Sequence, residues 1–266
     1  MAGIALDHTS FAVHDAMGWA RRLRRELGAT PIFGEQLAEF RYLLLHVGTA
    51  DDGARVELLE PRGAGFLTRF LSARGEGPHH ITFVVPDLRA MVAHARALGL
   101  TVVGEDHDHP PWREAFIAPD DKHGVVIQLA QSDRSYPPVE QLLSSRTRDL
   151  EDFPSSRGAT EPLWWTQLWE TAPGAVARLG TTHLASTDLG FSRLVFGDLL
   201  EARVAEDDSA LDLSWPGGSV RVHAADRPGV TGMSLRGGPA GGIAIGPARL
   251  GTTGSRPDVR ARNPYS

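Results

Sequence analysis

Two short segments of the chain place histidines where they could bind a metal ion. Residues 6–15, "LDHTSFAVHD", and residues 78–87, "PHHITFVVPD", share the frame x-His-x-x-Phe-x-Val-x-Asp, so His8 and His80 hold equivalent places. The apolar alternation in both segments predicts β-strands, in which neighbouring side chains point to opposite faces. Only one of His79 and His80 can therefore face such a site. We expect His80 to be the ligand and His79 to point away.

Each of these segments is followed, further along the chain, by an apolar strand that contains one polar residue. These residues are Glu57 in "VELLE" and Gln128 in "VIQLA". A polar side chain inside a sheet costs roughly 1–3 kcal/mol when it has no partner, and a carboxylate costs more. A metal ion could be the partner, because two imidazoles and two oxygen donors suit Zn, Co, Ni, Mn or Fe in the divalent state. The sequence thus predicts a site made of His8, Glu57, His80 and Gln128.

The elements around these residues recur in the same order. Each frame is followed by a helical pattern, "AMGWARRLRRELGA" or "LRAMVAHARALGL", that closes at Gly28 or Gly99. Strand patterns separated by turn-forming residues come next. Residues 1–60 and 76–131 are therefore predicted to be two βαβββ modules of an α+β protein. If the modules pair their sheets side by side into an open cup, their first and last strands can each project one ligand inward.

The chain changes character after residue 131. Residues 132–178 are rich in turn formers and carry three of the six tryptophans, which predicts a long connector anchored by aromatic side chains. Apart from "GIAIG", residues 237–266 are rich in Gly, Pro, Arg and Ser, which predicts that most of this tail has little regular structure. The metal cup is therefore expected to lie within residues 1–131.

Between the connector and the tail, residues 179–236 repeat the module in degenerate form. The segment "LGTTHLASTDLGFSRLVFGDLLEARV" copies the module opening with His183 in the ligand's place. Arg221 or Val222 stands where the first module has its glutamate, and Gly232 stands where a further histidine would be required. This third module is expected to keep the fold without the ligands. Its incompleteness would leave sheet surface that a homodimer could cover.

Composition limits the partners of the protein. The net charge is −6, and no run of Lys and Arg is dense enough to predict a nucleic-acid surface. The absence of cysteine excludes thiolate ligands and fits a reducing cytoplasm. No stretch approaches the roughly 18 apolar residues that span a bilayer, and the first residues lack a signal-peptide pattern. We therefore expect a cytoplasmic protein that binds a small-molecule substrate, with no nucleic acid and no membrane as partner.

The frame, its spacing and the strand endings resemble the vicinal oxygen chelate superfamily, which includes glyoxalase I, methylmalonyl-CoA epimerase, extradiol dioxygenases and the fosfomycin and bleomycin resistance proteins. The run from "LDHTSFAV" through "VELLEP" and "FLSARGEGPHHITFVVPDL" to "HGVVIQL" is most similar to methylmalonyl-CoA epimerases and their glyoxalase-like relatives. The resemblance covers about residues 4–131. It implies paired βαβββ modules with a metal site, whose ligand positions fall on His8, Glu57, His80 and Gln128.

The two oxygen ligands depart from the epimerase pattern. Those epimerases carry glutamate where this chain has Gln128, and can have an amide where it has Glu57. The near two-fold symmetry of the modules implies that metal binding survives this exchange. The resemblance also places a base in an "EQG"-like segment, which matches Glu35 in "FGEQLAEF" and leaves Glu39 as a nearby rival. Glu35 and Glu57 are thus the candidate catalytic residues.

Three functions fit these residues. The first is a metal-dependent isomerase, epimerase or lyase of the glyoxalase-like kind, in which a small carbonyl or thioester substrate chelates the ion and a glutamate moves a proton at the adjacent carbon. The second is an iron(II) ring-cleaving dioxygenase, which uses two histidines and one carboxylate but whose family pattern has glutamate in place of Gln128. The third is a non-catalytic binding or resistance protein, with the tryptophan-rich connector as a ligand wall. The ligand set favours the first, and no motif identifies the substrate.

Overall fold

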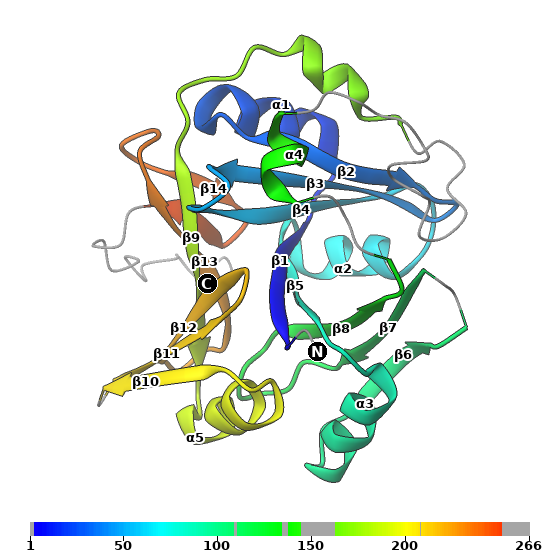
Figure 1. The fold of residues 1–266 in the computed structure, drawn as a ribbon, viewed down its shortest axis with the longest axis vertical. Coiled ribbons are helices and arrows are strands. Elements are labelled where there is room, and N and C mark those ends of the chain that lie inside the picture. The colour runs from blue at the N-terminus through cyan, green and yellow to red at the C-terminus, as the bar shows by residue number, and fades with distance from the viewer. Residues whose placement is uncertain (1–2, 109–110, 135–137, 145–162, 208, 252–266) are drawn as a thin grey trace, which may run out of the picture.

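The computed structural model of the chain describes residues 3–108, 111–134, 138–144, 163–207 and 209–251. Strands outnumber helices in these residues, and none of the described helices is long and apolar enough to cross a membrane (Figure 1). The elements in chain order are β1 Ala5–Ala12, α1 Ala16–Leu27, β2 Thr30–Gln36, β3 Phe40–Gly48, β4 Gly53–Pro61, α2 Phe66–Arg74, β5 Gly77–Val84, α3 Leu88–Ala97, β6 Val102–Asp106, β7 Trp112–Ile117, β8 Val126–Ser132, α4 Val139–Ser144, η1 Thr166–Glu170, β9 Arg178–Ser186, α5 Leu189–Ser192, η2 Arg193–Leu199, β10 Arg203–Asp207, β11 Ala210–Trp215, β12 Gly218–Ala224, β13 Gly229–Arg236, β14 Ile243–Ile245 and β15 Ala248–Gly251.

The first eight strands form one mixed sheet in the order β2-β3-β4-β1-β5-β8-β7-β6. In this sheet β1 runs parallel to β4, β5 runs parallel to β8, and β1 and β5 pair antiparallel at the centre. Each half of the sheet comes from one βαβββ unit, with α1 in the first unit and α3 in the second. The predicted α+β class with tandem βαβββ modules is therefore confirmed.

The aspartate of the repeated frame caps the helix that follows it. Asp15 accepts a hydrogen bond from the backbone N–H of Gly18 at 2.8 Å, and Asp87 accepts one from that of Ala90 at 3.0 Å. Such a cap contributes roughly 1 kcal/mol, because the first amides of a helix have no partner within the helix. At the end of α1, Gly28 has a φ of 69°, a left-handed conformation that glycine adopts without strain. The frame thus specifies both a ligand position and the start of a helix.

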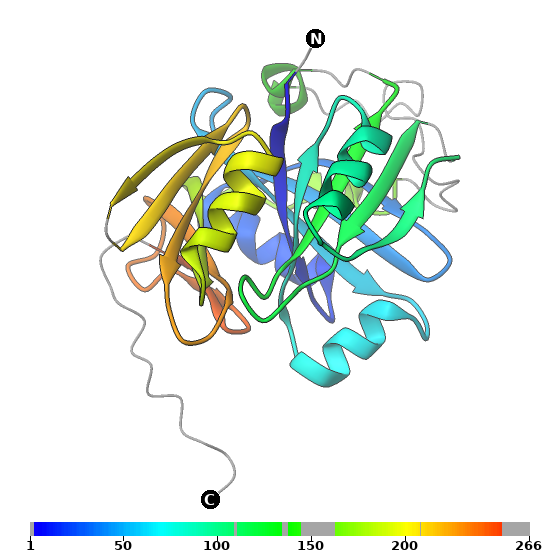
Figure 2. The same cartoon turned by 90° about the horizontal axis from the view of Figure 1, so that it is seen from below.

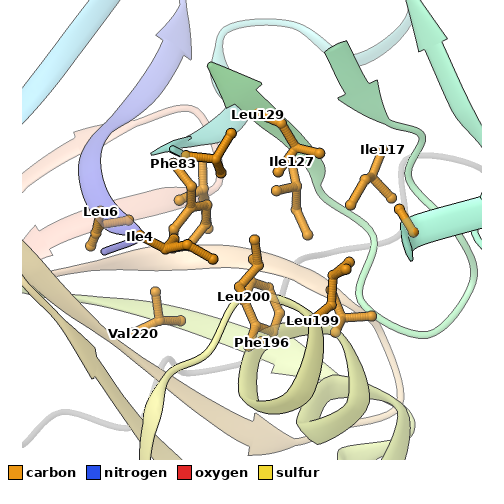
Figure 3. Packing of buried hydrophobic residues seen from close by; sticks show 14 of the residues in the cluster. Ile4, Leu6, Phe83, Ile117, Ile127, Leu129, Phe196, Leu199, Leu200 and Val220 are labelled. Atoms are coloured by element: carbon orange, nitrogen blue, oxygen red, sulfur yellow. The ribbon is translucent and has the colours of Figure 1, made fainter. Parts of the chain in front are cut away.

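The central strands of the first sheet separate apolar from polar side chains by face. On one face, alternate residues of β5 and β8 are fully buried in an apolar core (Figure 3), namely Ile81, Phe83, Ile127 and Leu129. The residues between them, including His80, Thr82 and Gln128, point to the other face because the side-chain period of a strand is two. The predicted ligands therefore share the face opposite the apolar core.

A second sheet contains the remaining strands in the order β10-β11-β12-β9-β13-β15-β14. It begins with a strand, a helical segment and three strands, and β12 runs parallel to β9 as β4 does to β1. Asp188 caps α5 by accepting from the N–H of Phe191 at 2.9 Å, which repeats the cap of the first two helices. This order is the one expected for the third module, whose boundaries at residues 179–236 remain a prediction.

The second sheet packs against the apolar back of the first. Figures 1 and 2 show its yellow and orange strands on the side of β1 away from the green strands β7 and β8. The ring of Phe83 lies 4.9 Å from that of Trp215 and 6.3 Å from that of Phe196, measured between centroids. Behind the face that carries the predicted ligands, the hydroxyls of Thr9 and Thr182 share a buried hydrogen bond of 2.8 Å. One half of the chain thus covers the other, and a homodimer stays a prediction.

The second sheet extends into the segment expected to be a Gly/Pro-rich tail. Strands β14 and β15 form a hairpin, and β15 pairs parallel with β13. Three apolar side chains of this hairpin, Ile243, Ile245 and Leu250, are fully buried. The apolar segment "GIAIG", which was excepted from the expected lack of regular structure, thus forms β14. Regular structure continues to Gly251, beyond that exception, because pairing with β13 and burial of three large side chains offset the flexibility of the glycines. Residues 252–266 lie outside the described residues.

The described end of the connector, residues 163–177, lies against the first module. The indole N–H of Trp165 donates to the carbonyl oxygen of Gly34 at 2.8 Å, and the Trp165 side chain is almost completely buried. A Cβ atom at Gly34 would lie 2.8 Å from the Trp165 ring, so glycine leaves the space that the indole needs. The guanidinium of Arg41 lies 4.2 Å from the ring centroid of Trp164. These tryptophans anchor the connector to β2 and β3.

Candidate metal centre

The four predicted ligands lie on four neighbouring strands at the centre of the first sheet. Glu57 is on β4, His8 on β1, His80 on β5 and Gln128 on β8, and these strands are adjacent in the order β4-β1-β5-β8. The register pairs Ser10 of β1 with Glu57 on one side and with His80 on the other. The parallel pairing within each module thus brings residues distant in sequence to one depth of the sheet.

Three of the predicted ligands form one cluster, which we call the His-Glu-His cluster. The Oε2 atom of Glu57 lies 3.5 Å from Nε2 of His8 and 3.6 Å from Nε2 of His80. One ligand atom from each residue lies within 4.8 Å of the other two, and the three side chains are buried. Imidazole nitrogen and carboxylate oxygen are ligands of divalent transition metals, so this donor set fits such an ion.

Two hydroxyl groups, which the sequence did not single out, support the cluster. Ser10 donates to Oε2 of Glu57 at 2.6 Å, and its oxygen lies 2.9 Å from Nε2 of His80. The Thr82 hydroxyl lies 2.9 Å from Nε2 of His8. Ser10 follows His8, and Thr82 follows His80, by two positions in the same strand, so the alternation of a strand is the signal that could have found them.

Gln128 lies beside the cluster in a hydrogen-bonded chain. Its Oε1 accepts from the Thr82 hydroxyl at 2.6 Å, and its amide Nε2 donates to Glu114 at 2.8 Å. Glu114, on β7, also accepts from the indole N–H of Trp112 at 3.1 Å. Sequence reasoning missed Glu114, although the alternation of "WREAFI" places it on one face with the two aromatic residues around it. It adds a carboxylate to the same face as the predicted ligands.

Charge is shared unequally within the cluster. Burial opposes the charged form of Glu57, but the positive charge of His8 outweighs it and lowers the pKa of Glu57 to about 2. Burial likewise opposes charge on His8, yet the Glu57 and Asp7 carboxylates raise the pKa of His8 to about 9. Burial dominates at His80 and lowers its pKa to about 3. A cation bound to both imidazoles must displace the proton of His8, so its binding would release a proton.

The cluster faces a large cavity on the open side of the first sheet. The cavity has a volume of about 870 Å³, and His8, Glu57, His80 and Gln128 are among the residues that line it. Phe66 and Val103 line it too and are partly exposed, by 39% and 49%. Its other large apolar lining residues are Ile32, Phe33, Leu37, Phe40, Tyr42, Leu44, Leu59, Val84, Trp112, Phe116 and Leu142. The predicted connector contributes Ser132, Arg134 and Leu142 to the lining, but none of its tryptophans is a lining residue in the described part of the chain.

Comparison with known proteins relates the segment that holds this site to one superfamily. The family model of the glyoxalase/bleomycin resistance protein/dioxygenase superfamily matches residues 7–116, a segment that includes all three residues of the His-Glu-His cluster. A methylmalonyl-CoA epimerase variant from Streptomyces coelicolor, in complex with 2-nitronate-propionyl-CoA, is 30% identical over 50% of this chain and 98% of its own, with a TM-score of 0.44. The chain belongs to this superfamily.

Other solved structures extend the likeness. Methylmalonyl-CoA epimerase from Mycobacterium tuberculosis is 29% identical over 49% of this chain and 89% of its own, with a TM-score of 0.43. A hypothetical protein from Staphylococcus aureus is only 12% identical but covers 87% of this chain and 90% of its own, with a TM-score of 0.54. The last likeness concerns the fold alone, over a span that includes both sheets. Comparison with curated proteins gives no match.

The superfamily resemblance suggested Glu35 as a base, and the structure places it behind the cavity wall. Glu35 is completely buried, and its Oε2 accepts from the hydroxyl of Tyr42 at 2.6 Å. Tyr42 lines the cavity, whereas Glu35 is not among the lining residues. The rival Glu39 is exposed and lines the cavity. Glu35 therefore reaches the cavity through the Tyr42 hydroxyl.

His79 departs from the expectation that it points away from the cup. It lines the cavity, and its Nδ1 lies 2.9 Å from Nδ1 of His80. Its ring packs against Phe70 of α2 at 4.9 Å and Phe66 at 5.7 Å. Simple alternation fails here because the pairing of β5 with β1 is irregular at this point. Ser10 pairs with His80 but the next residue, Phe11, pairs with Pro78, so His79 is an extra residue in β5, as in a β-bulge.

The second sheet lacks the predicted ligand set at the equivalent positions. In the second sheet His223 of β12 pairs with Ala185 of β9, and in the first sheet Glu57 of β4 pairs with Ser10 of β1. His223 is therefore the residue equivalent to Glu57, and the expectation of Arg221 or Val222 at this place was wrong. A register shift in β13 likewise puts Gly229, and not Gly232, in the place of the second histidine. His183 contacts the Ser234 hydroxyl at 2.7 Å, and Arg249 pairs with Gly232 where Gln128 pairs with Thr82. Within the described part of the chain, only the first sheet brings two histidines and a carboxylate within ligand distance of one another.

Proposed function

We propose that the protein is a metal-dependent isomerase or epimerase that acts on a small carbonyl or thioester compound with an apolar body. The His-Glu-His cluster on the wall of the cavity is the observation that carries this proposal. The apolar lining supports an apolar substrate, because covering apolar side chains with an apolar group lowers the free energy of the complex. The kinship with methylmalonyl-CoA epimerases supports proton transfer as the reaction.

The metal ligands in this proposal are His8, Glu57 and His80, with Gln128 as a fourth donor. A divalent ion held by them would polarise a substrate carbonyl and so make the proton on the adjacent carbon more acidic. The residues fit this task because they are buried, and because Ser10 and Thr82 restrain them by hydrogen bonds. The remaining steps belong to side chains that hold or move that proton.

Proton movement needs a carboxylate that is not already held by the ion. Glu57 would be a poor base, because a bound cation stabilises its charged form. Glu35, reached through Tyr42, belongs to the first module, and Glu114 belongs to the second. Epimerisation requires a group on each side of the reacting carbon, since the proton leaves one face and returns to the other. We therefore assign Glu35 and Glu114 to the two faces.

Deuterium exchange tests this proposal. The protein is loaded with Co²⁺ and incubated with methylmalonyl-CoA in deuterated water, and mass spectrometry measures deuterium at the carbon between the two carbonyl groups. The wild type should exchange this proton, and chelation of the metal should stop the exchange. Glu35→Gln and Glu114→Gln should each slow it by about 10²- to 10⁴-fold, the usual contribution of an acid or base, at full metal occupancy.

Glu26→Gln, at a partly exposed position on α1 where the carboxylate pairs with Arg22, is the matched control and should exchange at the wild-type rate. Unimpaired exchange in the metal-loaded Glu35 and Glu114 variants would exclude both residues as bases. A metal-loaded wild type that leaves methylmalonyl-CoA unchanged would exclude this thioester, and the same assay would then be run with 2-oxo acids.

An iron(II) dioxygenase is the second candidate, because two histidines and one carboxylate are also the ligands of ring-cleaving iron enzymes. Oxygen uptake separates the two reactions. The iron-loaded protein is mixed with catechol in an oxygen electrode, and our proposal expects no uptake above that of the metal-free protein. Uptake that depends on iron and on His80 would favour the dioxygenase.

A further inference from the structure

Each histidine of the cluster is contacted by the residue that immediately precedes it in the chain. Oδ2 of Asp7 lies 2.6 Å from Nδ1 of His8, and Nδ1 of His79 lies 2.9 Å from Nδ1 of His80. The opposite nitrogen of each ring, Nε2, faces the carboxylate of Glu57. The two imidazoles are therefore held from behind at the same atom, by partners of different charge.

We propose that Asp7 and His79 are positioning residues, which fix the ring orientation and the tautomer of His8 and His80 for a metal ion at Nε2. This inference rests on the proposed function. An imidazole that binds a metal through Nε2 must carry its proton on Nδ1, and that proton needs an acceptor. Asp7 is such an acceptor for His8. His79 is one for His80 when its own proton is on Nε2.

Asp7 is itself restrained in this position. The Arg55 guanidinium donates to its other oxygen, Oδ1, at 2.6 Å, and the Asp7 side chain is only 19% exposed. The carboxylate therefore bridges Arg55 and His8 through separate oxygen atoms and cannot rotate without breaking one of the two contacts. Arg55 also balances its charge, so that Asp7 can orient His8 without adding net charge to the site.

His79 is restrained by packing. The rings of Phe66 and Phe70 lie 5.7 and 4.9 Å from its own, and both belong to α2, which precedes β5 in the chain. The planes of His79 and His80 are nearly perpendicular, at 81°. This geometry allows the Nδ1–H of His80 to point at the lone pair of the His79 ring. Helix α2, which lies between the two modules in the chain, thus supports His80 of the second module through His79.

The difference in charge between the two supports gives an ordered expectation. A carboxylate makes the imidazole it accepts from a stronger donor to metal than a neutral ring does, so loss of Asp7 should weaken metal binding more than loss of His79. Loss of either support should weaken binding by about 10- to 100-fold, as is usual for partners of metal-bound histidines. The fold should persist, since the apolar core lies on the other face of the sheet.

The test measures Co²⁺ affinity of the metal-free full chain by its visible absorption, in competition with a chelator of known affinity. Asp7→Leu, which removes the acceptor at nearly unchanged shape, and His79→Phe should bind about 10- to 100-fold more weakly than the wild type. His79→Gln should regain most of the lost affinity, because its amide oxygen can still accept from His80. Asp51→Leu and His94→Phe, at two exposed positions, are the matched controls and should bind like the wild type.

Arg55→Gln separates orientation from charge. It leaves the contact between Asp7 and His8 in place, so affinity should change by less than in Asp7→Leu. An equal loss in both variants would overturn the role of Asp7. Urea unfolding in a chelator checks each variant for folding. If His79→Phe fails to fold, two measurements still test the role of His79: the Co²⁺ affinity of His79→Gln and the ring ¹⁵N chemical shifts of the Zn²⁺-loaded wild type. The inference requires these shifts to show a protonated Nδ1 in both His8 and His80.

The outcomes distinguish this inference from the proposed function. A wild type that binds Co²⁺ and variants within twofold of it would overturn the positioning roles and leave the metal site standing. A wild type that binds no Co²⁺ would overturn both, because the supports would then have no ion to serve.

Discussion

The hydrogen bond between Thr9 and Thr182 joins the two sheets directly behind the His-Glu-His cluster, and its contribution to stability can be measured. Both side chains are 1% exposed, and their hydroxyls are 2.8 Å apart. Replacing Thr9 with Val changes the shape of the side chain little but leaves the Thr182 hydroxyl buried without its partner. An unpaired buried hydroxyl costs about 1–3 kcal/mol, so Thr9→Val and Thr182→Val should each lower the free energy of unfolding by about that amount.

The double variant carries the sharper expectation. With both hydroxyls replaced by methyl groups, no polar atom of the pair remains unsatisfied, and the stability should return to near the wild-type value. The coupling energy of the double-mutant cycle would then be about 2 kcal/mol or more. Urea unfolding of the metal-free full chain, followed by circular dichroism, measures it. Thr101→Val, the same change at an exposed position, is the control.

Additive effects would refute this reasoning. If the double variant is destabilised by the sum of the two single variants, each hydroxyl has another partner and the contact between the sheets is not specific. If none of the three variants differs from Thr101→Val, water replaces the missing partner at this point of the interface.

Three further predictions concern stability. Burial lowers the pKa of His123, so as the pH falls this histidine takes up a proton in the unfolded chain before it does so in the folded one. The free energy of unfolding should therefore fall as the pH drops below about 6.5. His123→Gln should weaken this pH dependence in urea titrations at several pH values, whereas His94→Gln, at an exposed position, should not. Gly34→Ala should cost roughly 1–3 kcal/mol because the new methyl group would collide with Trp165, and an unchanged urea midpoint would contradict that contact. Phe196→Ala should cost about 3–5 kcal/mol, because the ring is fully buried between the sheets, and a loss under 1 kcal/mol would mean that the sheets close around the gap.

The repeated frame made the first sheet predictable from sequence. The two copies fix the order of elements, and equivalent places in paired modules converge on one site; the frame therefore located His8 and His80 and, with the matching strand ends, Glu57. The metal role of these residues and of Gln128 stays a prediction. Glu114 escaped notice because it belongs to no repeated pattern.

The positions of β-bulges and the packing between strands could not be predicted from the sequence. Bulges in β5 and β13 displaced His79 and Gly232 from their expected places, and the alternation of residue types gives no sign of where a bulge occurs. Glu35 was found on the expected strand, but its burial behind Tyr42 depends on packing between strands. The hairpin at residues 243–251 forms because β13 offers an edge to pair with, which is a property of the assembled sheet.

The covering of the first sheet by the second has a consequence for dilution. Where a separate subunit covers such a face, the covered fraction obeys mass action and falls with protein concentration. Here the covering half is tethered by the chain, so its effective concentration is set by the connector and not by the amount of protein in the cell. The strands that carry the cluster should therefore keep their support at any dilution, and metal affinity measured at nanomolar and micromolar protein should agree.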